Sequence, residues 1–148
     1  MYILLYESFK GNLKFETESD DEYVKIKAFL NGNEIGHINI EFIISGFWIF
    51  EGEITEEEYD EHFPNDRFAK IESFKVYDKY KGKGYSKEIF KKGIDYIQKS
   101  SDEEIIYLNA SPMGYGLDID QLVNLYKSFG FETIISYPEN KEMILRLV

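Results

Sequence analysis

The stretch from Val76 to Phe90 constrains the fold most, because a strand-like run passes through a tight turn directly into an amphipathic helix. The turn reads Lys81-Gly82-Lys83-Gly84-Tyr85-Ser86. Glycines let the backbone approach a ligand closely, and the first amides of a helix offer hydrogen bonds and a positive dipole end. The segment therefore predicts a cradle for a diphosphate. Its glycine spacing matches neither a Walker loop nor a Rossmann fingerprint.

The turn resembles motif A of the GNAT N-acetyltransferases, whose pattern is Gln/Arg-x-x-Gly-x-Gly/Ala and whose ligand is the pyrophosphate of acetyl-coenzyme A. Lys81 stands at the Gln/Arg position, Gly84 at the glycine and Ser86 at the Gly/Ala position. Lysine keeps the charge but lacks the planar fork of arginine. The resemblance implies acetyl-coenzyme A as co-substrate. The residues it assigns to that molecule are Phe74, Val76, Lys81, Gly82, Lys83, Gly84, Tyr85 and Ser86.

A second segment, residues 105–131, resembles motif B of the same family, commonly Leu-Tyr-x-x-x-Gly-Phe. Here the motif reads Leu125-Tyr126-Lys127-Ser128-Phe129-Gly130-Phe131, at the end of a helix expected over Ile119–Phe129. The resemblance implies that Tyr126 protonates the departing thiolate. Tyr126 also lies on the apolar face of that helix, so a purely structural role as a core aromatic stays open.

A base is needed to take the proton of an attacking amine. Glu72 is the first candidate, because it lies on the strand that leads to the cradle, four residues before Val76. The next strand carries Asn109 where many family members have a glutamate, and an amide cannot act as a base. His37 is a second candidate, since histidine titrates near neutral pH. An exposed strand carboxylate and a structural histidine remain the alternatives.

Charge is divided unequally along the chain. Residues 1–72 hold 17 acidic and 6 basic side chains, which accounts for the whole net charge of −11. Residues 75–99 hold eight lysines against three acidic side chains. This basic stretch in an acidic protein predicts a polyanionic ligand, such as coenzyme A. The lysines expected to face it are Lys81, Lys83, Lys87 and Lys91.

Composition excludes several classes of protein. The chain has no cysteine and only two histidines, which rules out disulfides, thiolate chemistry and a histidine-rich metal site. The opening residues 1–6 lack the features of a signal peptide or membrane span, so we expect a cytoplasmic protein without membrane contact. Direct nucleic-acid binding is disfavoured, because only the local lysine patch is basic. At 148 residues, one domain over 1–148 is expected.

The order of elements predicts an α+β fold, GNAT-like, with a central mixed and mostly antiparallel sheet flanked by helices. Expected strands cover residues 2–8, 12–18, 23–30, 34–44, 47–53, 67–77, 105–111, 132–137 and 142–148. Expected helices follow Thr55, Tyr85 and Asp118, with capping boxes at Thr55/Glu58 and Asp118/Gln121. The usual family helices between the first two strands are missing, because Gly11–Glu34 is typical of strand and acidic turn. The acceptor site must therefore be built differently from that of the family, with the first hairpin and the helix after Thr55 as its expected walls.

The acceptor class is predicted from charge alone. The acidic run from Glu51 to Glu61 would attract a protonated amine: a protein lysine or N-terminus, a polyamine or an aminoglycoside. A solvated helix face explains the same run equally well. The alternative to an N-acetyltransferase is a non-catalytic acyl-coenzyme A binder or an acidic protein-interaction module. The hairpin expected over residues 132–148 could also mediate a homodimer, which stays an alternative to a monomer.

Overall fold

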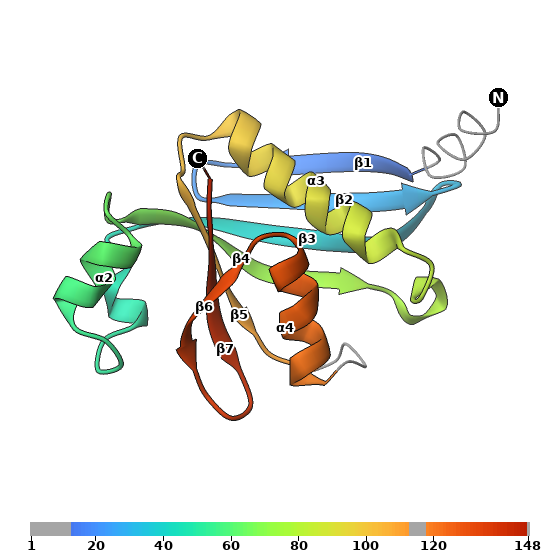
Figure 1. Cartoon of the computed structure of the whole chain (residues 1–148). Coiled ribbons are helices and arrows are strands. Elements are labelled where there is room, and N and C mark those ends of the chain that lie inside the picture. Colours follow the sequence, from blue (N-terminus) through green and yellow to red (C-terminus); the bar gives the residue numbers. More distant parts are fainter. Residues whose placement is uncertain (1–12, 113–117, 148) are drawn as a thin grey trace.

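The computed structural model in Figure 1 describes residues 13–112 and 118–147, which form a seven-stranded sheet with three α-helices. The strands are β1 (Leu13–Ser19), β2 (Tyr23–Leu30), β3 (Asn33–Ile44), β4 (Arg67–Val76), β5 (Ile105–Ala110), β6 (Glu132–Ser136) and β7 (Lys141–Arg146). The helices are α2 (Glu56–His62), α3 (Tyr85–Ser100) and α4 (Ile119–Ser128). The strand order is β1-β2-β3-β4-β5-β7-β6, antiparallel throughout except for the parallel pair β4–β5. The predicted α+β class and mixed, mostly antiparallel sheet are thus confirmed. The strand expected over residues 2–8 lies outside the described residues.

One face of the sheet packs against α3 and α4. On β2 and β3, apolar side chains alternate with polar ones, and the buried set includes Ile26, Ile38 and Ile40. Buried residues of α3, among them Ile89 and Phe90, join the same core cluster. Because side chains of a strand alternate between the two faces of the sheet, the apolar ones share one face. On that face α3 packs against β3 and β4 (Figure 1).

The opposite face holds a second core, which is mainly aromatic and is covered by α2. Its buried members are Ile43, Phe50, Tyr59, Phe63, Phe68, Ile105, Tyr107 and Ile144. Phe63 stacks on Phe50 and Phe68, with ring centroids 5.4 and 4.6 Å apart. Because α2 covers only one end of this face, the rest of it, on β1–β3, is left to polar side chains.

The strand predicted over residues 47–53 is wrong. Gly46–Ile49 forms a 3-10 turn that follows Ser45, whose φ of 58° reverses the chain. A Cβ atom at Gly46 would lie 2.6 Å from the ring of Phe68, so the chain passes very close to the second core here. Phe50 then enters that core completely buried. The apolar residues of this segment serve aromatic packing rather than a strand.

Both predicted capping boxes are present. Thr55 accepts a hydrogen bond from the backbone of Glu58 at the start of α2, and Asp118 accepts one from Gln121 at the start of α4. In each case the third helical residue bonds back to the cap, which satisfies two amides at once. In the described part of the chain, no helix is long and apolar enough to cross a membrane.

Candidate functional site

The site begins where β4 and β5 separate. These two strands pair only at Ala69–Ile106 and Lys70–Tyr107. Beyond Lys70, β4 continues to Val76 and β5 to Ala110 without pairing to each other. Parallel strands that diverge leave backbone groups on both sides of a gap, where a ligand can reach them. The gap faces α4, which follows β5 in the chain (Figure 1).

A β-bulge in β4 accompanies this separation. In the ladder with β3, Asn39 pairs with Ser73 but the next residue, Ile40, pairs with Ile71. Glu72 is therefore an extra residue without a partner on β3. A bulge bends its strand and redirects a side chain, and bulges are frequent next to active sites. Here it turns β4 away from β5 and exposes the Glu72 carboxylate.

The gap between the two strands is a cavity of ≈ 290 Å³, which we call the β4–β5 pocket. It brings together Glu72 and Tyr126, the two side chains predicted to carry out proton transfer. The other lining residues are Lys70, Ile71, Ser73, Phe74, Leu108, Asn109 and Ser111. The sequence separates Glu72 from Tyr126 by more than fifty residues, so it is the fold that makes them neighbours.

Tyr126 is both a core residue and a pocket residue. It is only 5% exposed and its ring packs on Phe90 and Phe131, with centroids 5.3 and 6.1 Å apart. It nevertheless lines the β4–β5 pocket. The two interpretations of Tyr126 made from the sequence are therefore compatible, because the packed ring fixes the direction of the hydroxyl.

Glu72 is exposed and has one salt bridge, in which its Oε1 lies 3.1 Å from Nζ of Lys70. Ser73, next to it, accepts a hydrogen bond of 2.7 Å from Nδ2 of Asn39. The strand is thus anchored to β3 immediately after the bulge. A carboxylate that is held on a fixed backbone and remains open to solvent can accept a proton and pass it to water.

A second cavity, of ≈ 560 Å³, opens between the β4–α3 turn and α4; we call it the α3–α4 pocket. Phe74 lines both this pocket and the β4–β5 pocket, so the two adjoin. Five of the predicted cofactor residues line it, namely Phe74, Val76, Lys81, Gly82 and Ser86. Lining residues that the sequence analysis did not assign to the cofactor are Tyr80, Lys87, Gln121, Leu122, Asn124, Leu125 and Ser128, of which only Lys87 was expected to face an anion.

Three predicted cofactor residues do not line the α3–α4 pocket. Lys83 is exposed, Gly84 is the N-cap of α3, and Tyr85 is buried in the main core. Tyr85 points inward because the first turn of α3 already carries the apolar stripe that packs on the sheet. Of the four lysines predicted to face an anion, Lys81 and Lys87 line the pocket. Lys81 also forms a salt bridge of 2.8 Å with Asp78.

The turn before α3 fits a phosphate group. Gly82 and Gly84 have φ values of 76° and 86°, which other residues rarely adopt. A Cβ atom added at either position would meet nothing within 4 Å, so both glycines face open space. The N-cap residue of α3 is Gly84, which has no side chain to bond the amides of the first turn. These amides are therefore available to an anionic ligand.

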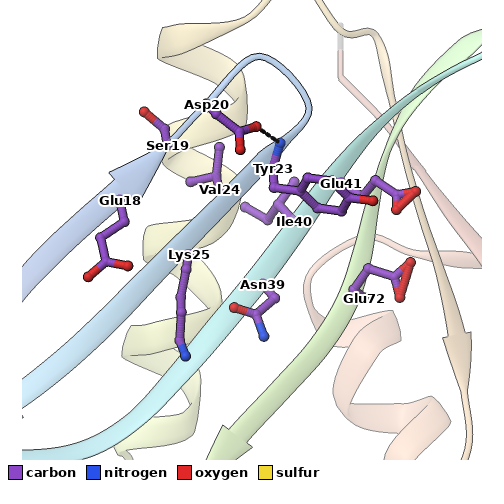
Figure 2. A pocket seen from close by; sticks show the side chains of 10 residues that line it. All are labelled: Glu18, Ser19, Asp20, Tyr23, Val24, Lys25, Asn39, Ile40, Glu41 and Glu72. Carbon is purple, nitrogen blue, oxygen red and sulfur yellow. Dashed lines mark hydrogen bonds between the residues drawn. The ribbon is translucent and has the colours of Figure 1, made fainter.

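A third cavity, of ≈ 640 Å³, lies on the polar face of β1–β3, and we call it the β1–β3 pocket. Figure 2 shows Glu41 and Glu72 with their carboxylates on the same side, beside the ring of Tyr23. Those carboxylates raise the pKa of the Tyr23 hydroxyl, with Glu41 as the largest cause. Glu18 and Asp20 also line the pocket, against a single cation, Lys25. Glu72 lines both this pocket and the β4–β5 pocket, and Phe74 lines both the β4–β5 pocket and the α3–α4 pocket. The β4–β5 pocket therefore lies between the other two.

The expected walls of this acidic region are correct only in part. Of the predicted first hairpin, only the second strand lies within the described residues, as β1, and its end at Glu18 and Ser19 lines the β1–β3 pocket together with β2. The helix after Thr55 does not line this pocket. The acidic run from Glu51 to Glu61 lies instead around α2, which contributes Tyr59 to the second core. The carboxylates that gather here come from separate strands, and no local pattern could have identified them.

His37 is not among the lining residues of these three cavities. It pairs with Lys75 across β3 and β4, and its Nδ1 is 3.5 Å from the hydroxyl of Tyr77. Burial lowers the pKa of His37, and the charge of Lys25 lowers it further. The structure therefore does not bring the second candidate base to the gap.

A hydrogen-bond network behind the gap, buried only at Tyr107 and Glu142, was missed by the sequence analysis. Asn109 donates hydrogen bonds from Nδ2 to Oε1 of Glu142, at 2.9 Å, and to Oδ1 of Asn140, at 3.1 Å. The hydroxyl of Tyr107 donates to the other oxygen of Glu142. Burial and this carboxylate raise the pKa of Tyr107. The partners lie on β5 and β7, more than thirty residues apart, and nothing in the local sequence indicates their pairing.

Comparison with known proteins gives structural matches only. No protein-family model and no curated protein sequence matches the chain. An acetyltransferase of the GNAT family from Streptococcus pneumoniae matches with a TM-score of 0.60 and 16% identity, over 88% of this chain and 70% of that one. Arabidopsis thaliana NAA60, in complex with a bisubstrate analogue, gives 0.59 and 15%, over 85% and 76%.

A third structural match was solved with coenzyme A bound. The PaiA N-acetyltransferase from Thermoplasma acidophilum, in complex with coenzyme A, matches with a TM-score of 0.58 and 13% identity. The match covers 84% of this chain and 61% of that one. Identities this low establish a common architecture and nothing finer. The seven-stranded sheet that splits between β4 and β5, with α3 and α4 on one face, is the fold of the GNAT N-acetyltransferases.

Proposed function

We propose that this protein is an N-acetyltransferase that moves an acetyl group from acetyl-coenzyme A to a protonated primary amine. The observation that carries the proposal is that three cavities share lining residues: Phe74 lines both the α3–α4 pocket and the β4–β5 pocket, and Glu72 lines both the β4–β5 pocket and the β1–β3 pocket. A polyanionic co-substrate and a cationic acceptor could thus enter from opposite sides and meet in the gap.

The coenzyme half is supported by the fit of the turn before α3. Open glycines, uncapped helix amides and the side chains of Lys81 and Lys87 suit a diphosphate. From Phe74 to Val76, β4 pairs with β3 but not with β5. Its edge toward β5 suits the extended arm of coenzyme A, which could add to the strand by main-chain hydrogen bonds. Acetyl-coenzyme A, when bound, would supply the thioester.

The acceptor half is supported by charge. The β1–β3 pocket is lined by four carboxylates and one lysine, and the hydroxyl of Tyr23 stands beside two of the carboxylates. An ammonium group is stabilised there and must lose a proton before it can attack. Glu72 borders both this pocket and the gap, so we assign to it the removal of that proton.

Transfer then takes place in a ternary complex, in which the protein transfers protons and stabilises the charge that develops. The amine nitrogen attacks the thioester carbon, a carbon–nitrogen bond forms and the carbon–sulfur bond breaks. Backbone amides near Phe74 would stabilise the developing oxyanion, since fixed donors aimed at new charge are strongly effective. Tyr126 would give its proton to the departing thiolate and recover one from solvent or from the released amine proton.

The first test is calorimetric titration with acetyl-coenzyme A of the wild type and of a Ser86→Glu variant. A carboxylate in the first turn of α3 favours the helix but repels a diphosphate. We expect micromolar binding by the wild type and at least tenfold weaker binding by Ser86→Glu. Gln98→Glu, which adds the same charge at an exposed position at the other end of α3, is the matched control and should bind normally.

The second part of the test measures thiol release with amine acceptors. We expect Glu72→Gln to bind acetyl-coenzyme A like the wild type and to lose about a hundredfold or more in kcat/KM for the amine. Absence of acetyl-coenzyme A binding by the wild type would refute the proposal. Binding without turnover on any amine would instead favour the non-catalytic acyl-coenzyme A binder.

A further inference from the structure

A fourth cavity, of ≈ 630 Å³, lies past the β1–β2 turn near the C-terminal end of α3, and we call it the α3-end pocket. It contains the two most exposed large apolar side chains of the described residues: Ile44 is 74% exposed and Trp48 is 65% exposed. Tryptophan is rarely left in water, and exposed apolar groups with a polar rim mark interaction sites. Neither side chain belongs to the buried members of either core.

The rim of this pocket is strongly acidic. Its carboxylates are Asp20, Asp21, Glu22, Glu41, Asp102 and Glu103. The single cation among its lining residues is Arg67, which already donates to Glu103 at 2.6 and 2.9 Å. The other five carboxylates face no cation within the lining. An apolar anchor surrounded by unbalanced negative charge is complementary to a basic segment that carries an apolar side chain.

The α3-end pocket is continuous with the proposed acceptor pocket. Asp20, Val24 and Glu41 line both cavities. The third exposed large apolar side chain, Tyr23, is 51% exposed and lines the β1–β3 pocket. Tyr23 pairs with Glu41 across β2 and β3, so it lies between the reaction gap and the Trp48 end. Acidic and aromatic groups thus extend from Glu72, past Tyr23 and Glu41 on one face of the sheet, around the end of β3 to Ile44 and Trp48 beside the end of α3.

The dimensions of this surface suit a polypeptide. Along β3, Asn39 lies opposite the Glu72 bulge and Ile44 lies five residues further on. At about 3.3 Å per residue this is roughly 16 Å. A polyamine or aminoglycoside could fill the β1–β3 pocket alone, but it has no apolar group for Ile44 and Trp48. An extended peptide spans the distance with at least about five residues.

We propose that Ile44, Trp48 and the surrounding carboxylates dock a basic polypeptide segment, with an apolar side chain on Trp48, whose acceptor lysine reaches Glu72 about five or more residues away. The surface is thereby a docking site outside the reaction centre that selects protein acceptors over small amines. That the docked segment is acetylated rests on the transferase function proposed above, whereas docking itself does not.

The docking step has a direct spectroscopic readout. Trp48 is the only tryptophan of the chain, so its emission reports this surface alone. The probe is a twelve-residue arginine-rich peptide with one lysine and one leucine six residues from it, and no aromatic residue. We expect a saturable blue shift of the emission as the leucine covers Trp48. Replacing that leucine by serine in the peptide, or Ile44→Ser in the protein, should weaken the apparent affinity at least fivefold.

The kinetic part compares this peptide with Nα-acetyl-lysine methylamide as acceptor. We expect KM for the peptide to be at least tenfold lower, and Trp48→Ala to remove that advantage while kcat/KM for the short acceptor stays unchanged. Asp21→Asn should raise KM for the peptide more than Glu57→Gln does. Both variants lose one exposed carboxylate, but Glu57 lies on α2 and does not line the pocket.

The outcomes separate the two proposals. Acetylation of the short amine with no emission change and no advantage for the peptide overturns docking and leaves the transferase standing. A saturable emission change with no transfer to any amine supports docking and overturns the transferase. Equal effects of Asp21→Asn and Glu57→Gln, together with a peptide KM that Trp48→Ala leaves unchanged, would mean that only overall charge attracts the peptide, and would also overturn the docking site.

Discussion

Tyr126 has a ring and a hydroxyl with separable roles. The ring packs on Phe90 and Phe131, and the hydroxyl is the proposed proton donor in the gap. Tyr126→Phe keeps the ring, so we expect the free energy of unfolding to change by about 1 kcal/mol at most. We expect kcat to fall by about a hundredfold or more, because general acid catalysis typically contributes that much. Thiol release and calorimetry measure kcat and acetyl-coenzyme A affinity separately.

Tyr126→Leu is the companion variant, since it also removes ring packing. It should lose both kcat and stability, by about 1–3 kcal/mol. A Tyr126→Phe enzyme with unaltered kcat would show that the residue is only a core aromatic. An equal loss of acetyl-coenzyme A affinity in Tyr126→Phe would also contradict the assigned role.

The lowered pKa of His37 predicts that the stability of the protein, rather than its catalysis, depends on the charge of this residue. Its pKa is lowered below 6.5 mainly by burial and then by Lys25, so the folded state binds its proton less readily than the unfolded state does. Stability from this residue is therefore complete above pH about 6.5 and is lost as the pH falls through the folded-state pKa. We expect the wild type to lose stability relative to His37→Gln between about pH 7 and 5. Urea unfolding across that range measures the difference, and a constant difference would refute the assignment.

At the scale of elements, two glycines set how closely α3 and β4 approach β3. A Cβ atom at Gly36 would lie 2.3 Å from the backbone carbonyl oxygen of Lys75, whereas one at Gly93 would lie 2.6 Å from Cδ1 of Ile38. Backbone cannot move aside, but the end of an isoleucine side chain can. We expect Gly36→Ala to cost about 3 kcal/mol and Gly93→Ala less than about 1, because alanine also favours the helix by about 1 kcal/mol. Urea unfolding of both variants measures the difference. Equal losses in the free energy of unfolding would contradict this prediction.

The elements that could be predicted are those whose ends are set by local chemistry. The capping boxes at Thr55 and Asp118 depend on residues three apart, and both helices begin where expected. The 3-10 turn at Gly46–Ile49 could not be predicted, because the apolar side chains of residues 47–53 have the composition of a strand. What decides their conformation is packing against Phe68, which lies on β4.

The candidate site likewise has parts that could be predicted from the sequence and parts that could not. Its motif-bearing parts, the turn before α3 and Tyr126 on α4, could be identified because each lies within one short segment. The acidic β1–β3 pocket could not, since Glu18, Glu41 and Glu72 come from three strands. The bulge at Glu72 is equally invisible in the sequence. A one-residue irregularity in a ladder depends on how two strands pair and on nothing in either strand alone.

At the scale of the whole molecule, charge governs encounter with the two substrates. The net charge is −11, and five unpaired carboxylates border the α3-end pocket. We expect kcat/KM for the arginine-rich peptide to fall at least tenfold between ionic strengths of about 0.05 and 0.5 M, because salt screens long-range attraction. The KM for acetyl-coenzyme A should change much less, since the contacts proposed for its phosphates at the start of α3 are short-range.

Steady-state kinetics at several salt concentrations, with the peptide and with acetyl-coenzyme A as the varied substrate, measure this difference. Sodium chloride and potassium glutamate serve as parallel salts to separate screening from chloride binding. Equal salt dependence for both substrates would contradict the division of charge between the two sides of the molecule.

The bulge in β4 makes Glu72 an insertion that the architecture does not require. The pairs of β3 with β4 run in register on either side of it, from Gly36–Val76 to Asn39–Ser73 and from Ile40–Ile71 to Ile44–Arg67. Excising this single residue would join the two halves into one uninterrupted ladder with the same side chains facing each core. We therefore expect a variant with Glu72 deleted to keep the ladder between β3 and β4 and to lack the proposed base.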